Sequence, residues 1–133
     1  MKNLILVFAL VLVAGCAYPN KKAEPYLNEY AKQIIFTDNK NNCKVLGEIQ
    51  SFAQAPGVDW GEFTNYDLYV RNDLRNQASV FAKNGDNIRL RIIDKKVICW
   101  RDGKDCTTTI ENKTGILPNI TELKYTAEIL KCN

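Results

Sequence analysis

Residues 65–84 read NYDLYVRNDLRNQASVFAKN, and this stretch decides the fold. Within it Val70, Leu74, Ala78 and Phe81 recur at the spacing of one helix face, while charged and amide side chains fill most of the positions between them. Such a period predicts an amphipathic helix that buries its apolar stripe. We therefore expect one main helix, with the other elements packed against that stripe.

Both ends of this helix carry local signals. Thr64 or Asn65 can cap its start, since Thr64 stands three residues before the carboxylate of Asp67. Gly85 follows the last apolar residues and can adopt the left-handed conformation that commonly ends a helix. Asp67 and Arg71 are four residues apart, and we expect them to form an ion pair on the exposed side of the helix.

The segments on either side of the helix are rich in β-branched and aromatic residues, which favours strands. Residues 87–94 alternate apolar and charged side chains until Ile93 breaks the alternation. We expect strands at 32–37, 43–49, 87–94, 97–100, 107–110 and 126–132, a polar turn at 38–42, and mostly loop at 52–63 and 111–122. The predicted fold is α+β, a small mixed or antiparallel sheet packed on one main helix and stapled by two disulfides.

The N-terminus has the features of a secretory signal. Lys2 gives it a positive start, and residues 4–13 form an apolar run shorter than the roughly 20 residues that a membrane-spanning helix needs. The run ends in VAGC at 13–16, which resembles the lipobox of bacterial lipoproteins, where the cysteine is acylated and becomes the first residue. We expect Cys16 to carry the lipid. The other interpretation is an ordinary signal with a cysteine nearby by chance.

A lipid anchor at this point divides the chain into three parts. We predict a lipoprotein signal peptide at 1–15, a lipid-anchored tether at 16–30 and a single α+β periplasmic domain at 31–133. Three acyl chains would hold the protein to a bilayer in an effectively permanent way. Because Ala17 rather than an aspartate follows Cys16, we expect export to the outer membrane, with the domain at the inner leaflet and facing the periplasm.

Four cysteines remain after Cys16, an even number in an exported chain, so disulfides are the expected state. An Asp-Gly pair between Cys99 and Cys106 predicts a hairpin turn that places these two cysteines opposite each other, within disulfide distance. That pairing leaves Cys43 with Cys132. A zinc site is the rival interpretation, but the chain has no histidine and no C-x2-C spacing.

The charge balance argues against a polyanionic partner. Removal of residues 1–15 leaves 118 of the 133 residues, which is enough for one domain. Lys2 is the only charged residue removed, so 18 basic and 15 acidic residues become 17 and 15. We expect no nucleic acid partner. The partner that the sequence indicates directly is the lipid bilayer, through acylated Cys16.

No catalytic constellation stands out in the sequence. The absence of histidine removes the commonest general base and metal ligand. Asp59 and Glu62 lie close together beside Trp60, but acidic residues in a loop rich in glycine and proline are usually solvated. We expect no enzymatic activity, no cofactor and no metal.

Three segments of the sequence can be compared with a known family pattern. They are CKVLGEI at 43–49, the helix sequence NDLRNQA at 72–78 and the ending ILKCN at 129–133. Together they resemble a small bacterial lipoprotein family, the domain of unknown function 4156, which is in turn distantly similar to the RcsF stress-sensor lipoprotein. The resemblance covers most of the chain from residue 43 onward and implies a disulfide between the first and last of the four cysteines. The chain differs from the family pattern in its two further cysteines and in a longer tail region at 100–125.

Two functions are compatible with these features. The one we favour is a non-enzymatic envelope lipoprotein whose domain binds another envelope protein or senses the state of the envelope. The alternative is a small lipidated periplasmic ligand-binding protein or hydrolase. Trp60 and Phe63, in the predicted loop, are the candidate partner contacts, because large aromatic residues often anchor interfaces. Packing of this loop back across the sheet is the other interpretation of the two side chains.

Overall fold

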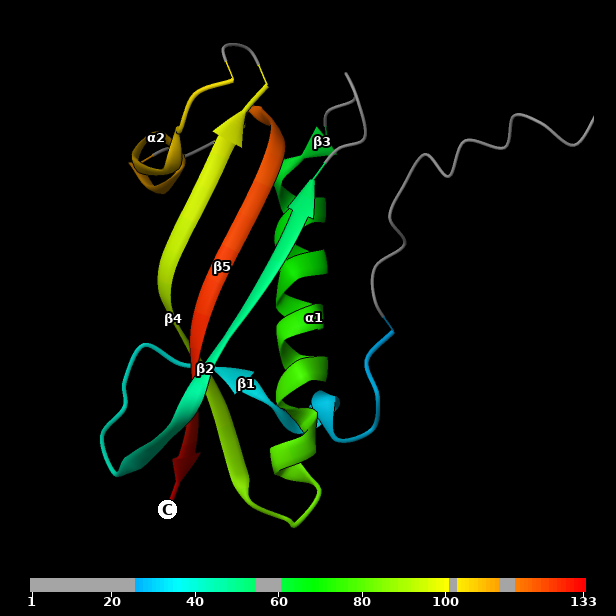
Figure 1. Ribbon diagram of the computed structural model, residues 1–133, viewed down its shortest axis with the longest axis vertical. Coiled ribbons are helices and arrows are strands. Elements are labelled where there is room, and N and C mark those ends of the chain that lie inside the picture. The colour runs from blue at the N-terminus through cyan, green and yellow to red at the C-terminus, as the bar shows by residue number, and fades with distance from the viewer. Residues whose placement is uncertain (1–25, 55–60, 101–102, 113–116) are drawn as a thin grey trace, which may run out of the picture.

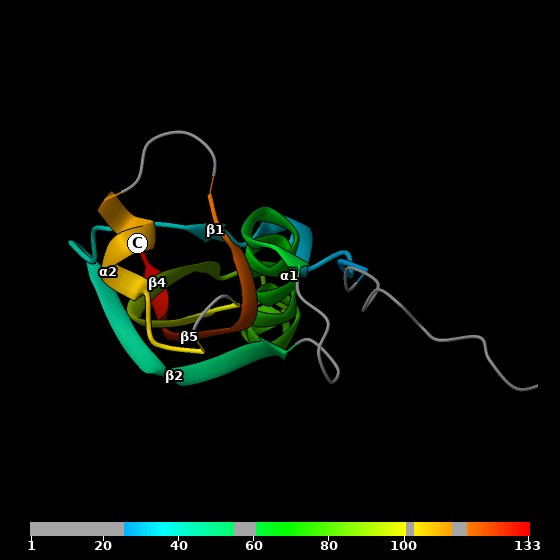
Figure 2. The same ribbon diagram turned by 90° about the horizontal axis from the view of Figure 1, so that it is seen from above.

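The computed structural model describes residues 26–54, 61–100, 103–112 and 117–133. The elements are η1 (Ala31–Gln33), β1 (Ile35–Phe36), β2 (Cys43–Gln54), β3 (Gly61–Glu62), α1 (Phe63–Ala82), β4 (Asn87–Cys99), α2 (Thr107–Asn112) and β5 (Asn119–Cys132). Among these residues the strands form a mixed sheet in the order β1-β4-β5-β2, with β1 parallel to β4 and β3 paired to β5. The main helix, α1, lies along one side of the sheet (Figure 1), as the view from above also shows (Figure 2). This arrangement confirms the predicted α+β fold.

The core lies between α1 and the sheet. On the helix, Val70, Leu74, Ala78 and Ala82 are buried, and each is four residues from the next. The sheet contributes buried side chains from its central strands, namely Ile88, Leu90, Val97, Ile120, Leu123, Tyr125, Ala127 and Ile129. The prediction that Phe81 belongs to the buried stripe is wrong, because its side chain is 38% exposed and Ala82 continues the row instead.

The start of α1 differs from the prediction, whereas its exit agrees with it. Glu62 is the N-cap residue and makes no side-chain capping hydrogen bond. The predicted caps Thr64 and Asn65 are therefore wrong, since both lie inside the first turn of the helix. At the other end the N–H of Gly85 donates to the carbonyl of Ala82 at 3.1 Å, and Gly85 has a φ of 79°. This left-handed residue confirms the predicted exit.

A single strand, β4, replaces the two strands predicted at 87–94 and 97–100. Its register against β5 shifts between Ile92 and Asp94, which makes Ile93 the extra residue of a β-bulge. The extra residue reverses the alternation of side chains, so Leu90 and Val97 are both buried against α1 although they are seven positions apart. The broken alternation at Ile93 is the trace of this bulge in the sequence.

The predicted strand at 107–110 is wrong, because α2 occupies these residues. The carboxylate of Asp105 accepts hydrogen bonds from the hydroxyl of Thr107 at 2.7 Å and from its backbone N–H at 2.9 Å. These two hydrogen bonds form an Asx-turn directly before α2, in which the N–H of Ile110 donates to the carbonyl of Cys106. The same two hydrogen bonds lower the pKa of Asp105. Of the predicted hairpin, the described residues keep the bridge between Ile98 and Asp105.

The paired strands β2 and β5 are longer than predicted. Their register begins with Cys43 opposite Cys132 and continues to the end of β2. The prediction of a loop from residue 52 is therefore wrong for Phe52, which lies in β2, and β5 begins within the stretch predicted to be mostly loop. Near the N-terminal end of the described residues, the observed strand is instead shorter than predicted. The predicted strand at 32–37 shrinks to the two residues of β1 and follows the short helix η1.

Candidate functional site

The structure describes only part of the set of predicted site residues. Cys16, the predicted lipid carrier, and Trp60, a predicted contact, lie outside the described residues. Phe63 is the first residue of α1, and its half-buried side chain packs against the core. The four other cysteines come together in two pairs.

Both predicted disulfides are confirmed. Cys43 and Cys132 stand directly opposite each other on β2 and β5, with their Cα atoms 4.0 Å apart. Cys99, the last residue of β4, is bonded to Cys106 with 5.8 Å between the Cα atoms. These two are not opposed as predicted, because the N–H of Cys106 donates to the carbonyl of Val97 instead. The two disulfides staple opposite ends of the sheet.

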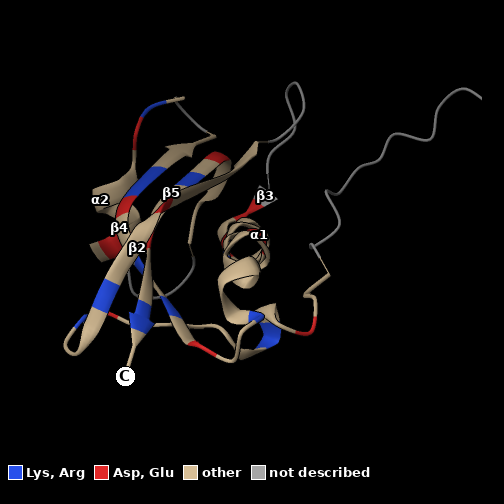
Figure 3. Cartoon of the chain, turned by 60° about the horizontal axis from the view of Figure 1, so that its bottom comes forward, with Lys and Arg blue, Asp and Glu red and all other residues tan. Residues whose placement is uncertain are grey.

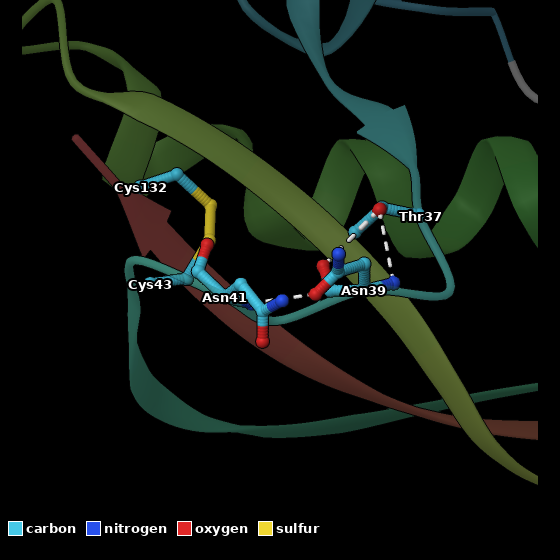
Figure 4. Close-up of a disulfide and its surroundings, with 5 residues drawn as sticks. All are labelled: Thr37, Asn39, Asn41, Cys43 and Cys132. Atoms are coloured by element: carbon cyan, nitrogen blue, oxygen red, sulfur yellow. Dashed lines mark hydrogen bonds between the residues drawn. A yellow bond between two sulfur atoms is a disulfide. The ribbon is translucent and has the colours of Figure 1, made fainter.

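The chain between β1 and β2 passes β4 and β5 on its way to the first disulfide (Figure 4). The hydroxyl of Thr37 donates to the carbonyl of Asn39 and accepts from its N–H, both at 3.2 Å, and the N–H of Asn41 donates to the Asn39 side chain at 2.7 Å. Asn42 has a φ of 61°, in the left-handed region that asparagine tolerates. The Sγ of Cys43 lies 3.4 Å from the carbonyl of Asn41, but a disulfide sulfur has no hydrogen to donate. The predicted polar turn is confirmed and leads directly into the disulfide.

Polar residues of the helix sequence NDLRNQA hold the segment that precedes β1. Arg75 donates from Nε to the carbonyl of Ala31 at 3.2 Å and from a terminal nitrogen to the carbonyl of Lys32 at 3.0 Å. Ala31 is itself completely buried. Burial lowers the pKa of the Arg75 guanidinium, which nevertheless stays charged because arginine is not deprotonated in proteins. Arg75 therefore acts as a fixed double donor to a backbone that approaches α1.

Asn76 and Ser79 hold the same segment closer to its beginning. The side-chain amide of Asn76 donates to the carbonyl of Tyr26 at 2.8 Å and accepts from the N–H of Asn28 at 3.1 Å, while the Asn28 side chain donates to Ser79 at 3.0 Å. We name Arg75, Asn76 and Ser79 the stalk clamp. These three polar side chains of α1 therefore bond to a neighbouring segment of the chain.

A pocket of about 270 Å³ lies between the start of α1, α2 and the strands β4 and β5. Its lining includes Phe63, Asp67, Arg71, Lys95, Ile110 and Tyr125. Apolar and charged groups thus line the same pocket, close to Phe63.

Asp67, Arg71 and Tyr125 form the polar wall of this pocket. The predicted pair between Asp67 and Arg71 exists at 2.9 Å, but its predicted position on the exposed side is wrong, because the buried hydroxyl of Tyr125 also donates to Asp67. The Arg71 guanidinium lies 4.8 Å from the centre of the Phe36 ring, a cation–π contact. Burial raises the pKa of Tyr125 far above its usual value, and the hydrogen bond to Asp67 raises it further. The hydroxyl therefore stays protonated and keeps donating to the carboxylate.

Lys95 stands at the same pocket with looser contacts. Its Nζ is 4.0 Å from a carboxylate oxygen of Glu111 and 5.8 Å from the centre of the Tyr125 ring. An exposed ion pair at this distance contributes little. Lys95 is therefore the more available of the two lining cations. Chemically, the pocket offers a cation and an aromatic ring for binding, while the carboxylate of Asp67 is already occupied by two donors.

No group of three or more histidine, cysteine, aspartate or glutamate side chains that could hold a metal ion occurs in the described parts of the chain. No helix among the same residues is long and apolar enough to cross a membrane. Comparisons with protein-family models, with curated proteins and with solved structures found no match. The family resemblance noted in the sequence therefore stays a prediction.

Proposed function

We propose that this protein is a lipoprotein of the bacterial outer membrane, anchored in the inner leaflet by acylated Cys16, whose domain faces the periplasm and binds another envelope protein. The observation that carries the proposal is the sequence VAGC at 13–16, at the end of an apolar run too short to span a membrane. The two disulfides support it, since disulfides persist in oxidising compartments such as the periplasm. In this role the domain acts by binding and not by catalysis.

The stalk clamp limits the distance between the domain and the membrane. Asn76 holds the backbone of Tyr26, and Cys16 precedes Tyr26 by ten residues. Ten residues span at most about 36 Å when fully extended. The point where the chain meets α1 therefore lies within that distance of the acylated residue. This short reach suits a partner in, or close to, the same membrane.

Trp60, with Phe63 three residues further along the sequence, is the proposed contact. Phe63 is half-buried and lines the pocket at the start of α1. Trp60→Ala should reduce crosslinking to the partner and leave the melting temperature nearly unchanged. Trp100→Ala, which removes an exposed tryptophan side chain of the described residues, is the matched control. A cost of roughly 3 to 5 kcal/mol in stability on Trp60→Ala would mean that the side chain belongs to the core, and the contact would be rejected.

The alternative function is a small lipidated ligand-binding protein or hydrolase. The pocket at Phe63 favours it, because charged groups of Arg71 and Lys95 converge on a partly apolar cavity. A thermal-shift screen with small aromatic carboxylates tests it. A saturable rise in melting temperature that Lys95→Ala abolishes would support ligand binding, and no rise with any compound would reject it for this class.

Crosslinking in intact bacterial envelopes tests the favoured function. Wild-type protein and Cys16→Ser are expressed at equal levels, labelled with palmitate, crosslinked, captured and identified by mass spectrometry. The wild type should incorporate palmitate, fractionate with the outer membrane and crosslink to a specific envelope protein. Cys16→Ser should lose all three properties. A Cys16→Ser protein that is still lipidated and still processed before residue 16 would show that the anchor is assigned wrongly.

A further inference from the structure

The face of the sheet that points away from α1 carries a row of three side chains. Phe52 of β2 is opposite Lys124 of β5, and Lys124 is opposite Lys96 of β4. Directly opposed residues project from the same face of a sheet. The neighbouring Tyr125 points to α1, where its hydroxyl donates to Asp67, so Lys124 points to the other face. We name Phe52, Lys124 and Lys96 the sheet-face row.

The two lysines of this row lack close counter-charges. Among the described residues neither has a carboxylate within 4.0 Å, and Lys96 interacts with Asp105 only at longer range. Both line a hollow of about 630 Å³, together with Asp73, which already accepts a hydrogen bond within α1, and Glu122. Figure 3 shows basic segments on both strands. Like charges directly opposite each other destabilise a sheet, so an added anion would relieve this repulsion.

The strand beside this row, β2, forms an edge of the sheet, as Figures 1 and 2 show. No other described strand pairs with its outer side. Residues 49–54 read IQSFAQ, without the charges or proline that usually protect an edge. The carbonyl of Gln50 accepts a hydrogen bond from the side chain of Gln77 at 2.9 Å. Phe52 is 44% exposed. Ser51 lines the same hollow and is only 4% exposed, and its hydroxyl has no hydrogen-bond partner among the described residues.

We propose that the edge of β2 and the sheet-face row together bind an extended acidic segment of a partner protein. The segment adds to β2 through backbone hydrogen bonds, the mode known as β-augmentation. Its acidic side chains extend over Phe52 towards the two lysines. Because neighbouring strands are about 4.8 Å apart, a glutamate on the added strand reaches Lys124 before Lys96. This inference rests on the proposed function as a protein-binding module and adds the surface and the chemistry of the partner.

Fluorescence anisotropy with two labelled peptides tests the inference, using the mature lipidated protein in neutral detergent micelles. One peptide alternates glutamate and valine, and the other alternates lysine and valine. The glutamate peptide should bind and weaken as salt is added, whereas the lysine peptide should not bind. Lys124→Glu should weaken binding about fivefold or more and Lys96→Glu about twofold, in line with exposed charge pairs. Lys83→Glu, an equal charge change at the exposed end of α1, should have no effect.

A stability measurement separates lost binding from lost folding. Lys124→Glu places a carboxylate opposite Lys96, so its melting temperature should rise and not fall. Equal affinity for both peptides, or equal weakening by Lys124→Glu and Lys83→Glu, would overturn the inference. So would binding to anionic phosphatidylglycerol vesicles without binding of the glutamate peptide, which would identify a lipid surface as the occupant.

Crosslinking in intact envelopes distinguishes failure of this inference from failure of the proposed function. If Lys124→Glu loses the envelope partner while Lys83→Glu keeps it, the sheet-face row is supported. If Lys124→Glu keeps the partner at wild-type yield, the sheet-face row is rejected and the proposed function stands. If the wild type captures no envelope protein, the proposed function fails, and the peptide measurement alone decides whether the surface binds acidic segments.

Discussion

Removal of each disulfide in turn gives a prediction whose size follows from the topology. The Cys43–Cys132 bond spans 89 residues of sequence and the Cys99–Cys106 bond spans 7. In the chain-entropy model a closed loop of about 90 residues removes about 4.6 kcal/mol of unfolded-state freedom, and one of about eight residues removes about 2.5 kcal/mol. Each pair contains one buried and one half-buried cysteine, so the packing lost on mutation to alanine is similar in both. The long-range pair should therefore cost about 2 kcal/mol more.

Urea and thermal unfolding of the two double-alanine variants, without reductant, measures this difference. About 2 kcal/mol corresponds to about 10 °C in melting temperature for a domain of this size. A variant lacking Cys99 and Cys106 that is no more stable than one lacking Cys43 and Cys132 would refute the loop-length argument. Crossed links, such as Cys43 to Cys99 in a non-reducing peptide map, would refute the pairing itself.

Three further outcomes are expected. In an alkaline titration followed by ultraviolet absorbance, Tyr125 should stay protonated after the other tyrosines ionise. Because the folded pKa of Tyr125 is raised, the stability of the domain should fall as the pH rises above about 10, the pKa of an unfolded tyrosine. Ionisation of all 6 tyrosines together would contradict this. Arg75→Ala removes the side-chain donor to the carbonyl of Lys32 and one of the two donors to the carbonyl of Ala31, and should cost about 1 to 3 kcal/mol in urea unfolding, with faster hydrogen exchange at 31–34; unchanged exchange there would show that Arg75 does not hold the segment. Leu74→Ala should cost about 2 to 5 kcal/mol and Phe81→Ala much less, and equal costs would place Phe81 in the core.

The main helix and the disulfides could be predicted because their signals are local. The recurrence of Val70, Leu74 and Ala78 depends only on the helical period, and Gly85 depends only on the backbone conformation at the exit. The prediction of the N-cap was wrong because β3 keeps the backbone extended as far as Glu62, so the helix begins before Thr64 and Asn65. Here pairing with a distant strand decides where the helix begins.

Strand boundaries could not be predicted because the pairing partner decides them. β2 continues past Ile49 because β5 runs beside it, and nothing within residues 50–54 indicates that neighbour. In the same way the run TTTI at 107–110 has strand propensity. The hydrogen bonds from Thr107 to Asp105, and the burial of Ile110 in the core, override that propensity and make a helix.

The candidate surfaces depend on register and on distant backbone, which a single sequence does not reveal. Arg75 bonds to a carbonyl 44 residues away, and a backbone acceptor leaves no signature in residue types. The row of Phe52, Lys124 and Lys96 exists only because three strands align these positions. The glycine, proline and aromatic residues of the sequence indicate the loop before α1 as a candidate contact. The charges of the sheet-face row, by contrast, are brought together only by the register of the strands.

Mass spectrometry of the protein extracted from bacterial outer membranes tests the central claim most directly. The lipoprotein account predicts that residues 1–15 are absent, that the chain begins at Cys16, and that its N-terminal peptide carries a diacylglyceryl group on sulfur and a third acyl chain on the amine. A mature chain that begins at another residue, or a Cys16 that carries no lipid, would contradict the account.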